Sequence, residues 1–189
     1  MKRDWKPGTM IYPLPAVMIS CGSDISEYNL LTVSWVGTIC SSPPMCYISV
    51  RRERHSYAIL KKNMEYVINL TTRQMAFATD WCGVVSGKDH HKFEEMKLTP
   101  GPSLLIRAPL VEESPLCIEC RVKEVLTLGS HDMFISDVVN VRADDKYIHP
   151  ETGAFDMEKA DLLVYVHGNY YGIADLIGHF GWSVRKKEK

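Results

Sequence analysis

The sequence predicts a mainly β protein, built as an antiparallel barrel with a few flanking helices. Short apolar runs rich in β-branched and aromatic residues recur along the chain, as they do in strands. Only two or three stretches show the apolar spacing of a helix. Many short strands with few helices favour an antiparallel barrel over a doubly wound parallel sheet. We expect a single domain over residues 1–189, ending in a short basic tail.

Seven segments carry the strand pattern. The first follows Lys2 and Arg3, as in a secretion signal, but Asp4 and two prolines interrupt the pattern that a signal needs. We therefore expect it to be a core strand. Gly129-Ser130-His131-Asp132 predicts a hairpin turn. The predicted strands are 16–21, 31–38, 45–50, 66–70, 116–128, 133–141 and 162–166.

Three helices are predicted between these strands. One begins at Ser56, whose hydroxyl suits the N-cap position. A second follows Thr72, where four apolar residues at 75, 77, 78 and 81 share one helical face. A short third helix covers 91–96.

The charge balance excludes some classes of partner. The chain has 22 Lys and Arg against 23 Asp and Glu, a formal net charge of -1. Nucleic-acid binding needs a basic face, so we expect none. We also expect no membrane insertion, because no apolar run approaches the ~20 residues of a span. A small local anion site remains compatible with this composition.

The six cysteines are too few for a disulfide framework in a chain of this length. We expect reduced thiols and a cytoplasmic protein. Cys117 and Cys120 form a CxxC motif, but residues three apart on a strand point to opposite faces. His90 and His91 are adjacent and do not converge on a helix. Core packing and a polar turn are therefore favoured, and a Cys/His metal or redox protein is the remote alternative.

Two short segments could hold a phosphate. Residues 51–55, Arg-Arg-Glu-Arg-His, lead into the predicted helix start, where free N–H groups and the positive end of the helix dipole lie. Further on, Ser86-Gly87 allows backbone to approach an anion, and Lys92 follows. The alternatives are a solvated charged loop and an ordinary turn.

The segment 29–35, Asn-Leu-Leu-Thr-Val-Ser-Trp, suits a flat heteroaromatic ring. On a strand, Thr32 and Ser34 share one face and Val33 and Trp35 share the other. The polar face offers hydrogen bonds and Trp35 offers a ring for stacking. The alternative is a half-buried strand with a core tryptophan.

Taken in order, several motifs resemble the flavin reductase-like proteins with an FMN-binding split barrel, most closely the flavoredoxin branch. No single motif is diagnostic, but their order and spacing are specific, and they cover nearly the whole chain. The motifs are Asn-x-x-Thr-x-Ser-Trp at 29–35, Arg-His-Ser-Tyr at 54–57, Cys-Gly-x-x-Ser-Gly-Lys-Asp at 82–89, Lys-Phe at 92–93, Ala-Pro-Leu at 108–110 and Gly-Ser-His-Asp at 129–132.

This resemblance implies a six-stranded, antiparallel, Greek-key-like split barrel, a homodimer and noncovalent FMN near the dimer interface. His131 matches a family position near the flavin, which either the same subunit or the other one supplies. No catalytic side chain and no metal ligand is expected. The cofactor-binding residues implied are Asn29, Thr32, Val33, Ser34, Trp35, Ser49, Arg51, Arg54, His55, Ser56, Tyr57, Ser86, Gly87, Lys92 and His131.

The function implied is that of an FMN-dependent oxidoreductase. It would take reducing equivalents from NAD(P)H and pass them to a small-molecule substrate such as a flavin or a metal complex. The alternative is a flavoredoxin-type electron carrier that serves a redox protein partner. Both need only bound FMN, so the sequence does not separate them.

Overall fold

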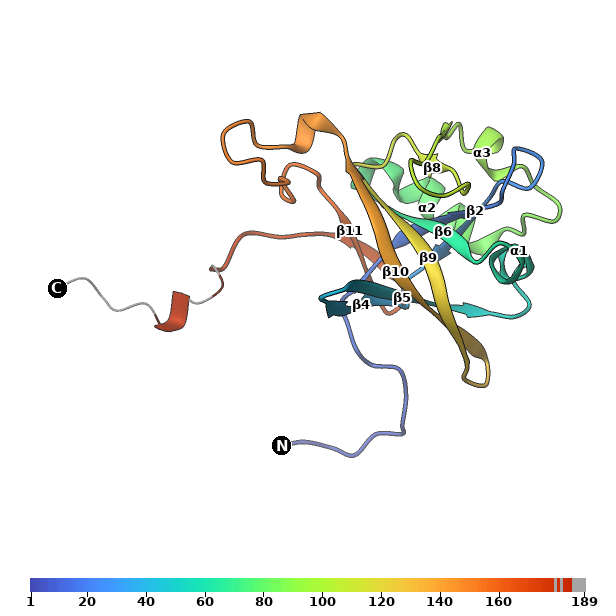
Figure 1. The fold of residues 1–189 in the computed structure, drawn as a ribbon. Coiled ribbons are helices and arrows are strands. Elements are labelled where there is room, and N and C mark those ends of the chain that lie inside the picture. The colour runs from blue at the N-terminus through green and yellow to red at the C-terminus, as the bar shows by residue number, and fades with distance from the viewer. Residues whose placement is uncertain (179, 181, 185–189) are drawn as a thin grey trace.

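The computed structural model describes residues 1–178, 180 and 182–184. The predicted basic tail at 185–189 lies outside the described residues. The fold is mainly β, as predicted (Figure 1). The strands are β1 Leu14–Pro15, β2 Val17–Cys21, β3 Asn29–Val33, β4 Val36–Ser41, β5 Pro44–Arg51, β6 Glu65–Leu70, β7 Pro100–Gly101, β8 Leu110–Val111, β9 Leu116–Thr127, β10 His131–Ala143, β11 Leu163–Val166 and β12 Asn169–Gly172. The helices are α1 His55–Asn63, α2 Ala76–Val84 and α3 Lys92–Glu95, with single 3₁₀ turns at Arg73–Met75, Asp145–Tyr147 and Trp182–Val184.

The main sheet closes into a barrel. Its strand order is β3-β2-β6-β9-β10-β5-β4, with every neighbouring pair antiparallel. The first and last strands of this order are consecutive in the chain, separated only by Ser34 and Trp35. Counted as one bent strand, β3 and β4 give the six strands that the sequence resemblance implies.

The prediction of one continuous strand over 31–38 was wrong. Pairing of β3 with β2 ends at Val33, which lies opposite Val17. Pairing of β4 with β5 begins at Val36, opposite Ile48. The chain changes partners between these points, so Ser34 and Trp35 lie between the two ladders, where the Trp35 carbonyl still accepts a hydrogen bond from the Ser49 N–H at 2.8 Å.

The apolar core lies inside the barrel. β2 is buried along its whole length because it packs on both faces. Val17 and Ile19 face the barrel interior, whereas Met18 packs with Leu30 and Phe93 in a second cluster beneath α2 and α3. The strand is accordingly apolar except at Ser20, whose buried hydroxyl donates to the Pro109 carbonyl.

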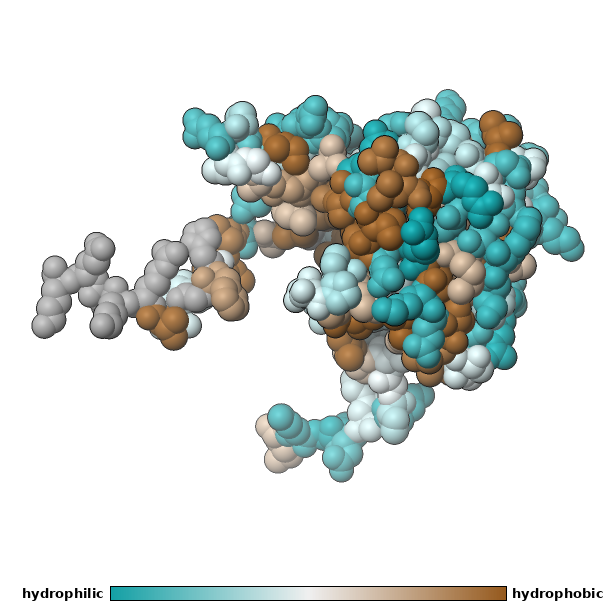
Figure 2. All heavy atoms as spheres, in the orientation of Figure 1, coloured by the Kyte–Doolittle hydropathy of each residue, from teal (hydrophilic) through white to brown (hydrophobic). Residues whose placement is uncertain are grey.

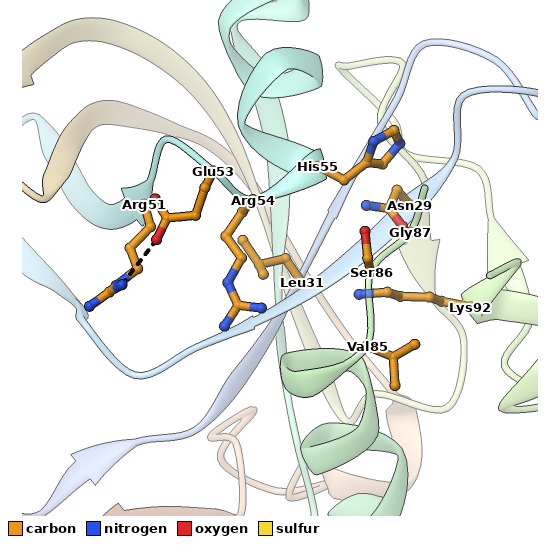
Figure 3. A pocket seen from close by; sticks show the side chains of 10 residues that line it. All are labelled: Asn29, Leu31, Arg51, Glu53, Arg54, His55, Val85, Ser86, Gly87 and Lys92. Atoms are coloured by element: carbon orange, nitrogen blue, oxygen red, sulfur yellow. Dashed lines mark hydrogen bonds and ion pairs between the residues drawn. The ribbon is translucent and has the colours of Figure 1, made fainter. Parts of the chain in front are cut away.

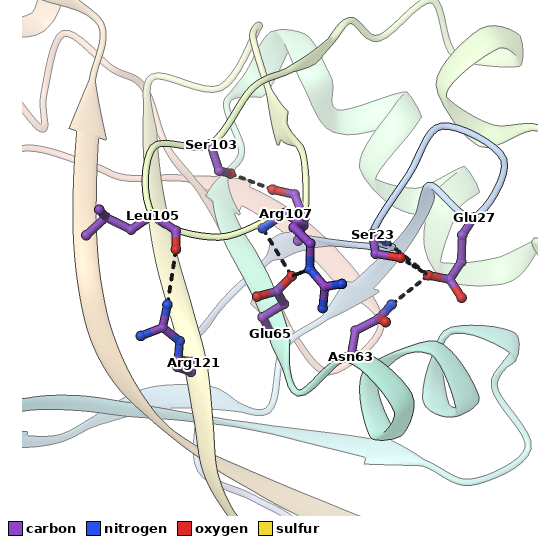
Figure 4. A network of polar contacts seen from close by, with 9 residues as sticks. Ser23, Glu27, Asn63, Glu65, Ser103, Leu105, Arg107 and Arg121 are labelled. Carbon is purple, nitrogen blue, oxygen red and sulfur yellow. Dashed lines mark hydrogen bonds and ion pairs between the residues drawn. The ribbon is translucent and has the colours of Figure 1, made fainter.

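Two buried carboxylates hold the loop between β7 and β8 against the barrel, and Figure 4 shows one of them, Glu65, with Arg107 of the loop. Glu119 of β9 accepts hydrogen bonds from the backbone N–H groups of Leu104 and Leu105, both at 2.8 Å. Glu65 of β6 accepts from the backbone N–H of Arg107 at 3.1 Å and from its Nε at 2.9 Å. Burying a charged group is costly unless it is hydrogen-bonded, and these contacts meet that requirement.

Cys117 and Cys120 point to opposite faces of β9, as predicted. Cys117 packs under the loop with Ala108 and Leu110, whereas Cys120 belongs to the barrel core. All six cysteines lie in the described part of the chain and are unbridged. The CxxC motif therefore brings no two thiols together.

The terminal segments extend away from the barrel (Figure 1). β1, β11 and β12 form a small separate sheet near the point where both segments leave. Hydrophobic side chains are exposed on the face that carries β9 and β10 and on the C-terminal segment (Figure 2). Among the described residues, no helix has the length and apolar character needed to cross a membrane.

Candidate functional site

Two adjoining cavities form one groove beside the bent strand. The smaller, of about 250 Å³, lies between β3, the start of α1 and the turn after α2. The larger, of about 420 Å³, lies over Ser34 and Trp35. Leu31, Arg51 and Arg54 line both, so the two cavities lie side by side. Their size suits a ligand of cofactor dimensions, for which pockets of roughly 300–1,000 Å³ are usual.

The first turn of α1 borders the smaller cavity. The N-cap is Arg54, in an extended conformation, and no side-chain hydrogen bond caps the turn. The N-terminal N–H groups of a helix favour an anion. The prediction of Ser56 as N-cap was wrong: its buried hydroxyl accepts a hydrogen bond from Asn29 Nδ2 at 2.7 Å and so joins α1 to β3.

Lys92 supplies a buried positive charge to the same cavity. Its side chain is only 3% exposed, and its Nζ donates to the carbonyl oxygens of Leu30 at 2.8 Å and Cys82 at 2.7 Å. Within the described part of the chain, no carboxylate lies within ion-pair distance of it. Burial lowers its pKa from 10.5 to about 8. An ammonium has three donors, so one remains for a ligand.

The turn after α2 forms the third wall of the smaller cavity. Ser86 accepts hydrogen bonds from the backbone N–H groups of Lys88 and Asp89, both at 3.2 Å. Gly87 lies against Asn29 so closely that a β-carbon placed on it would overlap the Asn29 carboxamide. Only glycine fits this approach between turn and strand.

The charges around this cavity favour an anion. Figure 3 shows Arg54 and Lys92 extending toward the same space from opposite sides. His55 also lines the cavity. The one carboxylate among its lining residues, Glu53, is paired with Arg51 at 3.0 Å. Arg54 and Lys92 are therefore left to balance a ligand's negative charge.

The larger cavity is lined by four consecutive residues, Thr32 to Trp35, together with Ser49. The sequence predicts that these four alternate between two faces. Thr32 and Val33 lie on β3, where Val33 also packs in the barrel core, and after the break Ser34 and Trp35 line the same cavity. Thr32 Oγ1 donates to the Thr79 carbonyl at 2.5 Å, so toward a ligand its hydroxyl offers only an acceptor. The hydroxyls of Ser34 and Ser49 remain available as donors.

An aromatic pair borders the larger cavity. The rings of Trp35 and His131 lie with their centroids 4.3 Å apart, tilted by 42°. Burial, with the nearby charge of Arg51, lowers the pKa of His131. The imidazole is therefore neutral near pH 7, and His131 reaches this cavity from within the same chain.

Tyr57 lies outside the lining residues of both cavities. Its hydroxyl donates to Asp132 Oδ2 at 2.5 Å, and Arg52 binds the other oxygen of that carboxylate at 2.8 Å. Tyr57 therefore acts with Arg52 to fix the start of β10, next to His131. The sequence motif at 54–57 gave no sign of this, because Asp132 is 75 residues away.

Several residues that line the cavities were not predicted from the sequence. Thr9, Tyr12 and Tyr165 border the larger cavity, and Leu31 and Val85 border the smaller. The first three come from the N-terminal segment and β11, which meet only in the folded chain. Of these five residues, only Leu31 lies within the segment 29–35 that the sequence predicts to bind a ring, and this position is the one feature of the sequence that could have identified it.

The remote metal hypothesis gains no support from the structure. His90 packs edge-on to Trp81 with centroids 5.4 Å apart and contacts Glu95, and His91 is the N-cap residue of α3. Neither meets Cys117 or Cys120. Among the described residues, no group of three or more His, Cys, Asp or Glu side chains is arranged to hold a metal ion.

The structure thus combines an antiparallel barrel with a cavity that favours an anion and a larger cavity adjoining it. The chain belongs to the flavin reductase family, whose model, described as flavin reductase like domain, matches residues 9–174. The resemblance and the fold class predicted from the sequence are thereby confirmed.

Solved structures and curated proteins agree with this assignment. The chain is similar to the flavoredoxin of Desulfovibrio vulgaris (Miyazaki F), with a TM-score of 0.90 and 26% identity over 98% of this chain and 100% of that one. It is also similar to a flavoredoxin from Methanosarcina acetivorans, with a TM-score of 0.87 and 25% identity over 98% of this chain and 100% of that one. The chain is also 29% identical to an FMN reductase (NADH) of Rhizobium rhizogenes over 112 residues, which cover 58% of this chain and 61% of that protein.

Proposed function

We propose that the groove binds one FMN noncovalently and that the chain is an FMN-dependent oxidoreductase. Lys92 carries the proposal: it is a buried ammonium, without a carboxylate partner among the described residues, facing a cavity that opens onto a ring-sized one. A phosphate ester has a charge of about -1.5 to -2 near neutral pH and matches the smaller cavity. Membership of the flavin reductase family supports the same ligand.

The smaller cavity would hold the phosphate. Lys92 offers its remaining N–H donor, and Arg54 approaches from the opposite side. The first turn of α1 adds N–H groups and the positive end of the helix dipole. Gly87 lets the turn come close to Asn29, which keeps the cavity narrow.

The larger cavity would hold the isoalloxazine ring. Ser34 and Ser49 offer hydroxyl donors, and Thr32 offers an acceptor, so the ring's polar edge has partners. The Trp35–His131 pair provides an aromatic border that excludes water from one side. A neutral imidazole at this place adds no charge beside the ring.

Bound FMN would supply the hydride and electron transfer chemistry, while the protein supplies position and electrostatics. The side chains hold the ring and phosphate, and none needs to act as nucleophile or base. We propose NAD(P)H as the electron donor and a flavin or metal complex as the acceptor. The FMN reductase (NADH) named among the relatives supports this donor.

Titration with FMN, followed by flavin fluorescence and absorption, tests the binding. We expect one FMN per chain. Lys92→Met should weaken the binding, whereas Lys88→Met, an exposed lysine in the same region, should not. A chain that binds no added FMN would contradict the proposal. Steady-state oxidation of NADH and of NADPH, with free FMN as acceptor, then tests the reaction.

The second candidate function is that of an FMN electron carrier without a small-molecule substrate. The similarity to flavoredoxin over nearly the whole of both chains favours it. The steady-state assay separates the two. Turnover of NADH or NADPH supports the reductase, whereas a bound flavin that is reduced only by a partner redox protein supports the carrier.

We also propose that the chain forms a homodimer. Ile11 of the N-terminal segment and Ile173 and Ile177 of the C-terminal segment are exposed on parts that extend from the barrel. A second copy of the chain would bury them. Light scattering should give twice the mass of one chain, and a monomer at micromolar concentration would contradict the proposal.

A further inference from the structure

Two of the six cysteines meet inside the barrel. Cys46 of β5 and Cys120 of β9 are 74 residues apart in the chain, yet their Sγ atoms are 3.5 Å apart. Both side chains belong to the barrel core. We propose that they form a thiol–disulfide site, which hydrogen peroxide oxidises to an intrachain Cys46–Cys120 disulfide and a dithiol reduces again. This inference is independent of FMN binding.

The geometry restricts the pairing to these two thiols. A disulfide has a sulfur–sulfur distance of about 2.0 Å. β10 lies between β5 and β9 in the sheet, so closing the gap requires these two strands to approach each other as well as the side chains to rotate. Cys117, three residues along the same strand, does not compete, because it lies on the other face and donates to the Val111 carbonyl at 3.6 Å. Cys21, also in the barrel core, directs its thiol to the Asn29 carbonyl at 3.8 Å.

The two thiols differ in their environment. Cys46 is 6% exposed and Cys120 is fully buried. The hydrogen bond between them lowers the pKa of Cys46, whereas the same contact, together with burial, raises the pKa of Cys120. A thiolate is the reactive form of cysteine. Cys46 is therefore the thiol that peroxide attacks first, and Cys120 is the thiol that resolves the product.

The chemistry balances in two steps. The Cys46 thiolate attacks one peroxide oxygen, so that an S–O bond forms, the O–O bond breaks and hydroxide leaves, giving a sulfenic acid. The Cys120 sulfur then attacks the sulfenic sulfur. The S–S bond forms, the S–O bond breaks, and the hydroxyl leaves with the thiol proton as water. Two thiols lose two electrons in total, and the peroxide is reduced to water and hydroxide.

Irregular strand pairing surrounds the thiol pair. The β4–β5 ladder shifts register between Thr38 and Cys40, and Thr38 lies opposite Cys46. The β9–β10 ladder shifts between Ile135 and Ser136, where Ser136 lies opposite Cys46, and again just after Val138, which lies opposite Cys120. Such bulges leave residues unpaired and disrupt the ladder locally. The interrupted ladders fix the strands less tightly around the pair, so that the strands can adjust there.

Peptide mapping tests the site. The full chain is treated with hydrogen peroxide and then denatured in the presence of N-ethylmaleimide, which alkylates the free thiols. It is then digested and analysed by mass spectrometry. We expect a cross-linked pair of peptides that contain Cys46 and Cys120, with Cys117 still alkylated. Dithiothreitol should abolish the cross-link. Recovery of both thiols in alkylated form after peroxide treatment would overturn the proposal.

Variants test the order of the two steps. In Cys120→Ala, Cys46 has no resolving thiol, so we expect dimedone to label a sulfenic acid at Cys46. Cys120→Ser gives the same test if the alanine variant does not fold. Cys117→Ala, the matched control on the same strand, should still form the cross-link. Sulfenic acid at other cysteines, with none at Cys46, would overturn the assignment.

Discussion

The affinity of the groove for FMN is expected to fall as the pH rises above about 8, because Lys92 loses its charge there. Burial lowers the pKa of Lys92 from 10.5 to about 8. This shift corresponds to roughly 3 kcal/mol against the charged form. A bound phosphate favours the charged ammonium, so the pKa of Lys92 rises in the complex.

The size of the effect follows from proton linkage. Free Lys92 is mostly charged below its pKa and mostly neutral above it, whereas in the complex it stays charged to higher pH. The dissociation constant for FMN should therefore increase roughly tenfold from near pH 7 to near pH 9. Titration of the phosphate contributes little to this pH dependence, because its second pKa is about 6 and it keeps its charge over this range.

Fluorescence titration with FMN at a series of pH values measures this dependence. Lys92→Met should bind FMN about 10- to 150-fold less tightly, the loss expected for a hydrogen bond to a charged group, and its affinity should hardly change with pH. Lys88→Met should keep the wild-type slope. A wild-type affinity that is flat over this range, or the same slope in Lys92→Met, would refute the reasoning.

Three further substitutions test separate parts of the structure. Gly87→Ala should weaken FMN binding at least about tenfold in the same titration, because its β-carbon displaces Asn29; unchanged affinity would show that the close approach is not needed. Trp35→Ala should reduce the binding free energy by about 1 kcal/mol, the usual value of an aromatic contact, and a tighter complex would argue against stacking. Glu119→Ala should lower the free energy of unfolding in urea by roughly 2–5 kcal/mol, because the N–H groups of Leu104 and Leu105 lose the buried carboxylate that accepts from them. Glu124→Ala, exposed on the same strand, should change it by less than about 0.5 kcal/mol, and equal losses in the two variants would contradict this role.

The fold was predictable because strand patterns depend on near neighbours. β2, β5 and β6 begin within one residue of their predicted starts. The break at Ser34 and Trp35 was not predictable from the local pattern, since it arises where the chain changes from one strand partner to another. Because of that break, Ser34 and Trp35 line the same cavity as Thr32 and Val33 of β3, an arrangement that the local pattern did not predict.

The site was predictable in its charges and less so in its contacts. Arg54, Gly87 and Lys92 were expected near a phosphate, and all three line one cavity. The roles of Ser56 and Tyr57 depend on Asn29 and Asp132, which are 27 and 75 residues distant, respectively. Such long-range hydrogen bonds leave no trace in the spacing of a short motif.

The most direct measurement is the comparison of FMN with riboflavin, which has the same ring and ribityl chain but no phosphate. Both are titrated into the wild-type chain under identical conditions. If Lys92, Arg54 and the start of α1 bind a phosphate, FMN should bind at least about 100-fold more tightly, from two or more charge-assisted contacts. Equal affinities for the two flavins would contradict the assignment of the smaller cavity to the phosphate.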